Sequence, residues 1–241
     1  MAEVRSFGPQ PAPSPSQRAM PSLLPPASWF RLALTCRRFE SIPRNPRKGR
    51  LLDLPDSCRL PELPRLSDLE PWAEVRSAWN PRGLAVQVEV RVRSDAPHGN
   101  LPRPNASAAL HLWIDTRDTR SIHRATRFCH HYAATLAASG SGLAVDIDRR
   151  PIPRASAEPT AARPETIHAR AERSAQRWLL ELFFPPTALD GFDPETNRRL
   201  GFHYLVTCPS RGEQPLIPAP ELPITENPSL WPTLELSDLP A

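Results

Sequence analysis

The chain of 241 residues carries 30 Lys and Arg against 26 Asp and Glu, a formal net charge of +4, and it holds 32 Pro against 9 Gly. So many prolines argue against long helices, because each one removes a backbone donor and clashes with the preceding helical turn. No stretch has the roughly 18 consecutive apolar residues of a membrane span. The N-terminus also lacks the charged, apolar and small-residue order of a signal peptide. We therefore expect a cytoplasmic protein without a membrane partner.

The basic residues are almost all arginines, with Lys48 as the one lysine, and they are scattered among the acidic residues. The densest basic run, between Arg37 and Arg50, is typical of a solvated loop more than of a phosphate-binding surface. Nucleic acid is therefore not expected as a partner. The four cysteines show no Cys-x-x-Cys spacing and are too few for a disulfide framework in a chain of this length, which predicts buried free thiols.

The first third of the chain contains one clear strand between two proline-rich stretches. Residues 1–27 combine Pro, Ser and Ala without periodicity, which predicts a disordered tail. Phe30–Arg37 then alternates apolar and polar residues with the period of two that a half-buried strand requires. Six prolines between residues 41 and 71 predict a long covering loop.

A hairpin and a further strand follow. Ala73–Trp79 and Leu84–Arg93 flank the turn residues 80–83, and four alternate valines mark one face of the second strand. In Leu110–Asp115, the leucines and the isoleucine share the face that we expect to point inward. His111, Trp113 and Asp115 share the opposite face.

The second half of the chain contains five more strand patterns and one short helical signal. Asp193 and Pro194 have the residue types of a helix cap and first helical position, but Gly201 leaves no room for a long helix. Residues 149–164 form another loop rich in proline and arginine. The predicted strands are Tyr132–Leu136, Ile167–Glu172, Gln176–Phe184, Gly201–Cys208 and Trp231–Leu236.

Eight or nine short strands without a long amphipathic helix predict an all-β fold. We expect an antiparallel two-sheet β-sandwich with long Pro-rich loops and at most short helical turns. No linker-like stretch divides the strands after residue 28. The prediction is therefore a single domain over residues 28–241 behind the tail of residues 1–27.

The face of Trp113 is the first candidate site. An aromatic ring beside a carboxylate on a sheet face suits a sugar, because the ring stacks on the pyranose and the carboxylate accepts from hydroxyl groups. Trp113, Asp115 and His111 are therefore candidate ligand-binding residues, with Arg117 and Arg124 as contacts to hydroxyl or acidic groups. The alternative is that loops cover this face and that Trp113 belongs to the core.

Two metal sites are also considered. Asp115 and Asp118 lie in a segment rich in oxygen ligands that suits Ca²⁺, and the alternative is a solvated turn with Asp–Arg pairs. His123 and His130, near Cys129, have the chemistry of zinc ligands, but their spacing matches no known motif. The alternative is that these histidines are hydrogen-bonded within the core or on a polar face.

Catalytic signatures are missing from the sequence. No serine lies in a Gly-x-Ser-x-Gly motif, and neither a phosphate-binding loop nor a dinucleotide-binding glycine pattern occurs. Glu181 lies between two leucines on a predicted strand, without an identifiable carboxylate partner. We therefore do not expect an enzyme.

Three stretches resemble the family 9 carbohydrate-binding modules and the wider DOMON-like sandwich group. Residues 110–115 resemble the family's apolar strand that ends in Asp, and residues 177–185, followed by Leu189, are similar to its strand of Trp, apolar, Glu, apolar and Pro. Residues 229–236 resemble its closing strand, with Leu-Trp where the family more often has Phe-Gly. Asp118, His123, Arg124 and residues 127–130 are also similar to a segment of bacterial proteins in this group.

The resemblance covers about residues 60–238. It implies a two-sheet sandwich that binds carbohydrate, often with structural Ca²⁺ and often beside a secreted glycanase. This chain shows neither a signal peptide nor a catalytic domain, and the family's sugar-clamping aromatics cannot be matched to positions in it. The leading hypothesis is a non-catalytic carbohydrate-binding domain. The alternatives are a protein-interaction or structural sandwich of unknown partner, and a histidine-based metal protein.

Overall fold

The computed structural model describes residues 32–45, 49–67, 70–91, 108–139, 142–174 and 177–241. The predicted tail of residues 1–27 lies outside this part of the chain, as do Phe30 and Val92. Every predicted strand is present, although several bounds move. The strands are β1 (Ala33–Arg38), β2 (Ala73–Asn80), β3 (Gly83–Arg91), β4 (Ala109–Asp115), β5 (Cys129–Ser139), β6 (Gly142–Arg149), β7 (His168–Arg173), β8 (Arg177–Phe184), β9 (Arg199–Cys208), β10 (Gly212–Pro215) and β11 (Thr233–Pro240).

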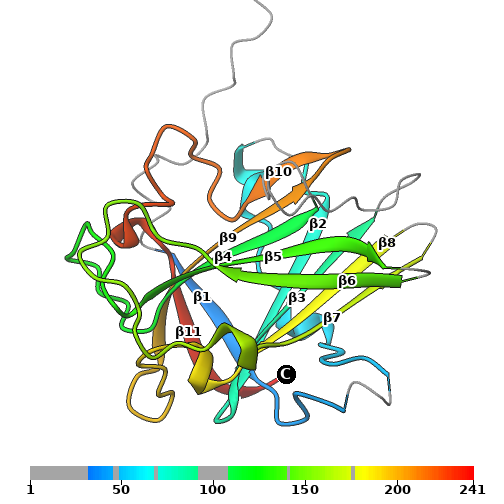
Figure 1. Cartoon of the computed structure of the whole chain (residues 1–241), viewed down its shortest axis with the longest axis horizontal. Coiled ribbons are helices and arrows are strands. Elements are labelled where there is room, and N and C mark those ends of the chain that lie inside the picture. The colour runs from blue at the N-terminus through cyan, green and yellow to red at the C-terminus, as the bar shows by residue number, and fades with distance from the viewer. Residues whose placement is uncertain (1–31, 46–48, 68–69, 92–107, 140–141, 175–176) are drawn as a thin grey trace, which may run out of the picture.

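The strands form one hydrogen-bonded sheet in the order β6-β5-β4-β9-β11-β1-β2-β3-β8-β7, and β10 pairs with β9. The sheet folds over on itself into two layers that cross, so that its two edge strands β6 and β7 come to lie side by side (Figure 1). All pairings are antiparallel except those of β1, which runs parallel to both β11 and β2. The predicted all-β, two-sheet sandwich is therefore confirmed, and its form is nearly closed.

Helical structure within the described residues is limited to short 3-10 turns, as predicted. The predicted helix start at Asp193 is a turn in which Oδ1 of Asp193 accepts the backbone N–H of Glu195 at 3.1 Å. None of the described helical turns is long or apolar enough to cross a membrane. The turns span Asp56–Cys58, Leu63–Ser67, Pro164–Thr166, Pro186–Ala188 and Pro228–Leu230.

Two strands were missed by the sequence analysis. In β6, half-buried Leu143, Val145 and Ile147 alternate with exposed residues, which is a strand pattern next to a glycine-rich turn. β10 has only four residues, Gly212–Pro215, which are too few for a periodic signal. Their positions at or near the edge of the sheet agree with their weak patterns, because an edge strand needs less apolar surface.

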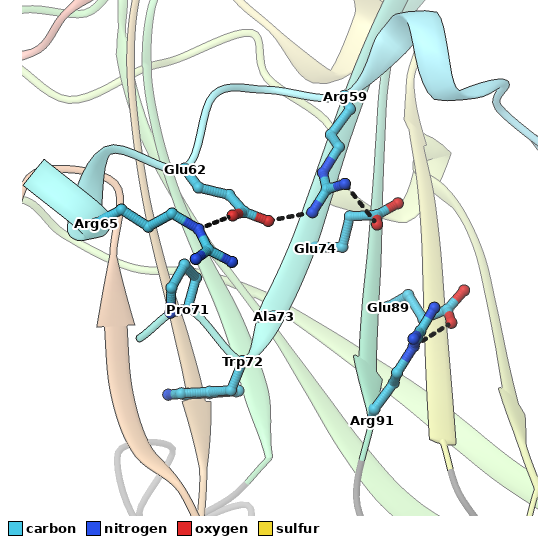
Figure 2. Close-up of a pocket in the computed structure, with 9 residues that line it drawn as sticks. All are labelled: Arg59, Glu62, Arg65, Pro71, Trp72, Ala73, Glu74, Glu89 and Arg91. Atoms are coloured by element: carbon cyan, nitrogen blue, oxygen red, sulfur yellow. Dashed lines mark hydrogen bonds and ion pairs between the residues drawn. The ribbon is translucent and has the colours of Figure 1, made fainter. Parts of the chain in front are cut away.

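The predicted loop after β1 covers the outer face of β2, β3 and β8. It makes a second, smaller core with these strands, and at its far end Arg59 and Glu62 form ion pairs with each other and with their neighbours (Figure 2). The members of this small core are Ile42, Leu51, Leu52, Leu54, Cys58, Ala78, Ala85 and Phe183.

Glu181 holds this loop in place. Its side chain is fully buried, and its two carboxylate oxygens accept the backbone N–H groups of Leu51, Leu52 and Asp53 at 2.8, 3.2 and 3.0 Å. On the neighbouring strand, Gln87 accepts the N–H of Leu54 at 3.1 Å. Glu181, which lacked a partner in the sequence analysis, therefore has a structural role.

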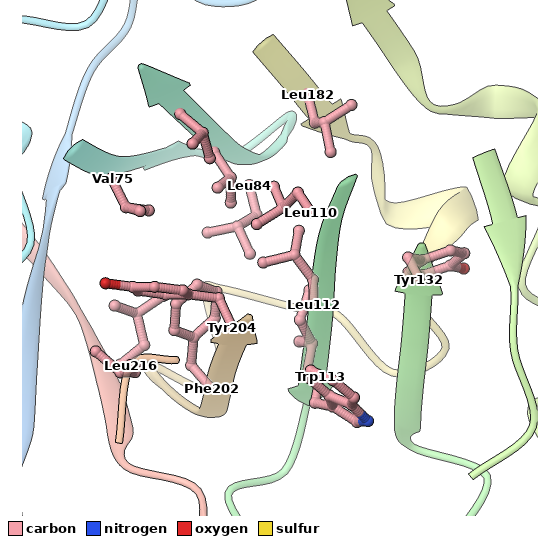
Figure 3. Close-up of a cluster of buried hydrophobic side chains, with 14 of the residues drawn as sticks. Val75, Leu84, Leu110, Leu112, Trp113, Tyr132, Leu182, Phe202, Tyr204 and Leu216 are labelled. Carbon is pink, nitrogen blue, oxygen red and sulfur yellow. The ribbon is translucent and has the colours of Figure 1, made fainter. Parts of the chain in front are cut away.

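The main core lies between the two layers. Figure 3 shows Val75, Leu84 and Leu182 from one layer facing Leu112 and Tyr204 from the other. In β4 all seven residues are buried, which means that the outer face of this strand is covered as well as the inner face. The four cysteines are free and buried, as predicted.

We predict that Glu181→Gln lowers the free energy of unfolding by about 1–3 kcal/mol, because the amide group turns an N–H donor toward backbone donors that the carboxylate now satisfies. Urea denaturation followed by circular dichroism measures the change. The matched control is Glu172→Gln, since Glu172 is a half-buried carboxylate on β7 that pairs with Arg170 and should contribute less than about 1 kcal/mol. Equal effects of the two variants would contradict the role assigned to Glu181.

Candidate functional site

A row of aromatic rings crosses the outer face of β4, β5 and β9. The strand register places Trp113 opposite His131 of β5 and His203 of β9. The ring centre of Trp113 lies 4.3 Å from that of His131, with the planes at 15°, and 5.4 Å from that of His203. His111 stacks on Trp113 at 5.8 Å. We refer to these four residues as the His–Trp cluster.

Three members of the cluster are covered, and His131 is half-buried. Trp113 is only 3% exposed, and His111 and His203 are equally buried. The loops that follow β6 and β10 contribute Ile152 and Ile217 to the same buried apolar cluster as Trp113. The second possibility raised by the sequence, that loops cover this face of β4, is therefore the one that the structure shows.

Four buried ring nitrogens of the cluster lack a well-formed hydrogen bond among the described residues, although the backbone of Pro151 interacts with the ring of His131. They are Nε2 of His111, Nε1 of Trp113, Nδ1 of His131 and Nδ1 of His203. The remaining ring nitrogens of His111 and His131 face each other, with Nδ1 of His111 3.1 Å from Nε2 of His131. Buried polar atoms are nearly always paired, and each unpaired one costs about 1–3 kcal/mol. Such a concentration on one face marks a place where a hydrogen-bonding ligand would gain contacts.

The histidines of the cluster are neutral at physiological pH. Burial lowers the pKa of His111 to about 4, and the nearby charge of Arg150 acts in the same direction. Burial also lowers the pKa values of His131 and His203 to about 3. A neutral imidazole has one donor and one acceptor. The cluster therefore offers uncharged groups of both kinds, which is the complement of a hydroxyl group.

A pocket of about 470 Å³ opens beside His203. Its walls come from β9, β10 and the proline-rich loop after β10, and they are mainly apolar with a few polar groups. This composition is typical of a small-molecule site. The walls include His203, Leu205, Glu213, Ile217, Leu222 and Thr225.

Asp115 shares the outer face of β4, but its carboxylate turns to the loop that follows. Oδ1 accepts the backbone N–H of Arg117 at 2.9 Å, and Oδ2 accepts that of Thr119 at 2.7 Å. Burial raises the pKa of Asp115, and the two backbone hydrogen bonds oppose this shift. An added Cβ at Gly201 would lie 3.1 Å from the Asp115 Cβ, so the two strands approach closely here. Asp115 therefore shapes the loop.

The calcium hypothesis joins Asp115 to Asp118. Oδ2 of Asp118 accepts the hydroxyl of Thr233 at 2.8 Å and lies 3.3 Å from Nε of Arg199. Both carboxylate oxygens of Asp115 and Oδ2 of Asp118 thus face N–H, O–H or guanidinium groups, which does not favour a cation. The calcium ion stays a prediction, and elemental analysis of the purified protein tests it.

The zinc hypothesis joins His123 to His130. His123 is exposed, with Nδ1 3.0 Å from the hydroxyl of Ser229. His130 is buried on the inner face of β5 and stacks on Tyr132 at 6.1 Å. Among the described residues, no three His, Cys, Asp or Glu side chains gather in a way that could hold a metal ion. Zinc at these two histidines likewise stays a prediction.

Arg117 and Arg124 are engaged outside the His–Trp cluster. The guanidinium of Arg117 lies 4.7 Å from the ring centre of Phe128. Arg124 donates to the carbonyls of Arg154 and Ala155 at 2.8 and 3.4 Å, which ties its loop to the loop after β6. Both residues are exposed, so they remain accessible to a ligand.

The structure therefore unites two of the predicted residues, Trp113 and His111, with two that the sequence analysis did not place, His131 and His203. His203 lies between Phe202 and Tyr204, whereas His131 follows another histidine, so the sequence shows only which face of its own strand each residue occupies. Their proximity to Trp113 depends on the pairing register of β4 with β5 and β9.

We predict that the free energy of unfolding falls as the pH drops from about 7.5 to about 5. The unfolded chain binds protons on these histidines with the ordinary pKa of 6.5, whereas the folded chain does so only near pH 3–4. Protons therefore favour the unfolded state over this interval, by up to about 2 kcal/mol for each buried histidine. Urea denaturation at both pH values measures the fall. A pH-independent stability over this range would contradict the assignment of buried neutral rings.

No protein-family model matches the chain, and no curated protein matches its sequence. Solved structures of similar fold include two carbohydrate-binding modules. A family 9 carbohydrate-binding module from Caldicellulosiruptor kristjanssonii in complex with cellotriose has a TM-score of 0.54 at 12% identity, over 86% of this chain and 94% of that one. The module from the same organism in complex with glucose has a TM-score of 0.53 at 13% identity, over 86% and 96%. The resemblance to the wider DOMON-like group stays a prediction, while this chain has the fold of the family 9 carbohydrate-binding modules.

Proposed function

We propose that the chain is a non-catalytic carbohydrate-binding domain whose ligand enters the pocket beside His203, the one member of the His–Trp cluster that lines this pocket. The observation that carries the proposal is the pocket itself, whose mainly apolar wall includes His203, a neutral imidazole with a buried ring nitrogen that has no hydrogen-bond partner among the described residues. The fold supports it, since solved structures with this fold hold cellotriose and glucose.

The chemistry of the pocket suits an uncharged polyol. A sugar hydroxyl both donates and accepts, and the neutral ring of His203 offers a partner for each role. Apolar side chains such as Leu205 and Leu222 provide contact for the C–H groups of a pyranose, and Glu213 at the wall accepts from a hydroxyl. No net charge is needed for recognition.

The remaining predicted residues do not line the pocket beside His203. Asp115 positions the loop after β4, and exposed Arg117 and Arg124 are proposed contacts of longer glycans. Calcium and a cytoplasmic location stay predictions. The burial of Trp113 favours one other function, a protein-interaction domain whose sandwich faces are simply covered.

We predict that glucose and short cello-oligosaccharides give a saturable heat signal in calorimetric titration of the full chain. His203→Leu should weaken this binding about tenfold, because it removes the polar imidazole ring from the pocket wall. The same substitution should leave the free energy of unfolding unchanged or raise it, because it also removes an unpaired buried nitrogen. Weaker binding without a loss of stability would show that His203 contacts the ligand and is not needed for the fold.

His168→Asn is the matched control, since His168 is exposed on β7 in the other layer. It should leave both quantities unchanged. The titrations are run with Ca²⁺ and again with chelator, so that any dependence on calcium is measured. A flat response across a panel of mono- and oligosaccharides would contradict the proposal and favour the protein-interaction alternative.

A further inference from the structure

A second hollow lies next to the segment that β10 contacts through Gln214. It has a volume of about 240 Å³ and is formed at the start of β2, where Trp72, Arg65 and Arg91 stand around Ala73 (Figure 2). Side chains alternate along β10, so that Glu213 lines the pocket beside His203 whereas Gln214 points the opposite way, toward Trp72. Gln214 thus connects β10 to the backbone of two residues that line the second hollow.

Trp72 is held in a fixed position. The side chain of Gln214 accepts the backbone N–H groups of Trp72 and Ala73 at 2.7 and 2.9 Å, and it donates to the carbonyl of Ala73 at 2.8 Å. The ring of Trp72 is half-buried, because it packs on the main core and also lines the hollow. A ligand that stacks on this ring therefore meets a surface that loses little freedom on binding.

The polar groups around the hollow are also fixed, because each carboxylate is shared by two guanidinium groups. Glu62 pairs with Arg59 and Arg65, and Glu74 pairs with Arg59 and Arg76. Glu89 on β3 is likewise shared by two arginines, Arg91 and Arg177. Surface ion pairs contribute only about 0–1 kcal/mol each, so stability alone does not explain such a network around a half-exposed indole.

The network offers both donors and acceptors without net charge. The lining holds three arginines and three glutamates, which cancel. Each guanidinium has five N–H donors, more than its ion pairs use, and each carboxylate has further lone pairs. Planar groups of both kinds, next to an aromatic face, match the paired hydroxyls and the C–H face of a sugar ring. A neutral lining does not favour an anion.

From this geometry we infer that the hollow is a second carbohydrate site, for a single uncharged pyranose unit stacked on Trp72. The smaller volume, about 240 Å³ against about 470 Å³, assigns it the shorter ligand. The choice of a pyranose rests on the proposed function, whereas the site itself is independent of the His–Trp cluster.

The test follows the indole N–H signals of the full chain by NMR during titration with methyl glucoside and, separately, with methyl glucuronide. Trp72→Phe and Trp113→Phe identify the two indole signals. The expected result is a saturable shift of the Trp72 signal with the glucoside, which persists in His203→Leu. Arg65→Gln should weaken it about threefold to tenfold, since Arg65 is exposed and lines the hollow. Arg173→Gln, an exposed arginine on β7, should not.

Each other outcome decides a separate point. A shift at Trp113 without one at Trp72 would overturn the second site and leave the proposed function standing. Tighter binding of the glucuronide than of the glucoside would overturn the assignment of an uncharged ligand. A shift at Trp72 alone would support the second site and contradict a ligand at the His–Trp cluster, and no shift at either ring would overturn both.

Discussion

The parallel pairing of β1 with β11 is the constraint on which the two-layer sheet depends. β11 lies between β9 and β1, and β1 continues to β2, so these strands join the layer of β6, β5, β4 and β9 to the layer of β2, β3, β8 and β7. The paired residues, such as Cys36 and Leu236, are separated by 200 positions. Closing so long a loop costs conformational entropy. Burial of Leu34, Cys36, Leu234 and Leu236 in the main core offsets that cost.

The outer face of β4 shows how far the sequence can predict a site. Period-two alternation places His111 and Trp113 on one face, and it also predicts the strongly patterned strands β3, β8 and β9 correctly. It does not show that His131 and His203 are their neighbours, since that follows from the register between strands 18 and 90 residues away. Nor does it show where the Asp115 carboxylate turns, because two backbone N–H groups of the following loop decide that. The short strand β10 leaves no pattern at all.

The two hollows hold their polar groups in different ways. At the first, burial keeps His203 neutral, as it does His111 and His131 of the same cluster, and Nδ1 of His203 has no hydrogen-bond partner among the described residues. At the second, the charges are retained near the surface and cancel through shared ion pairs, as at Glu62. Desolvation governs the first environment and mutual neutralisation the second, and both leave hydrogen-bonding groups for an uncharged ligand.

The alternation of side chains along β10 also limits how this segment can vary in evolution. Glu213 and Pro215 face one hollow, while Gln214 clamps the backbone of the other. Inserting or deleting one residue here would turn every side chain of the strand to the opposite face. The same change would remove the hydrogen bonds of Gln214 to the backbone of Trp72 and the side chain of Glu213 from its pocket. Homologous chains that keep both hollows should therefore differ in this strand by substitution, and place their insertions in the turn before Gly212 or in the proline-rich loop after Pro215.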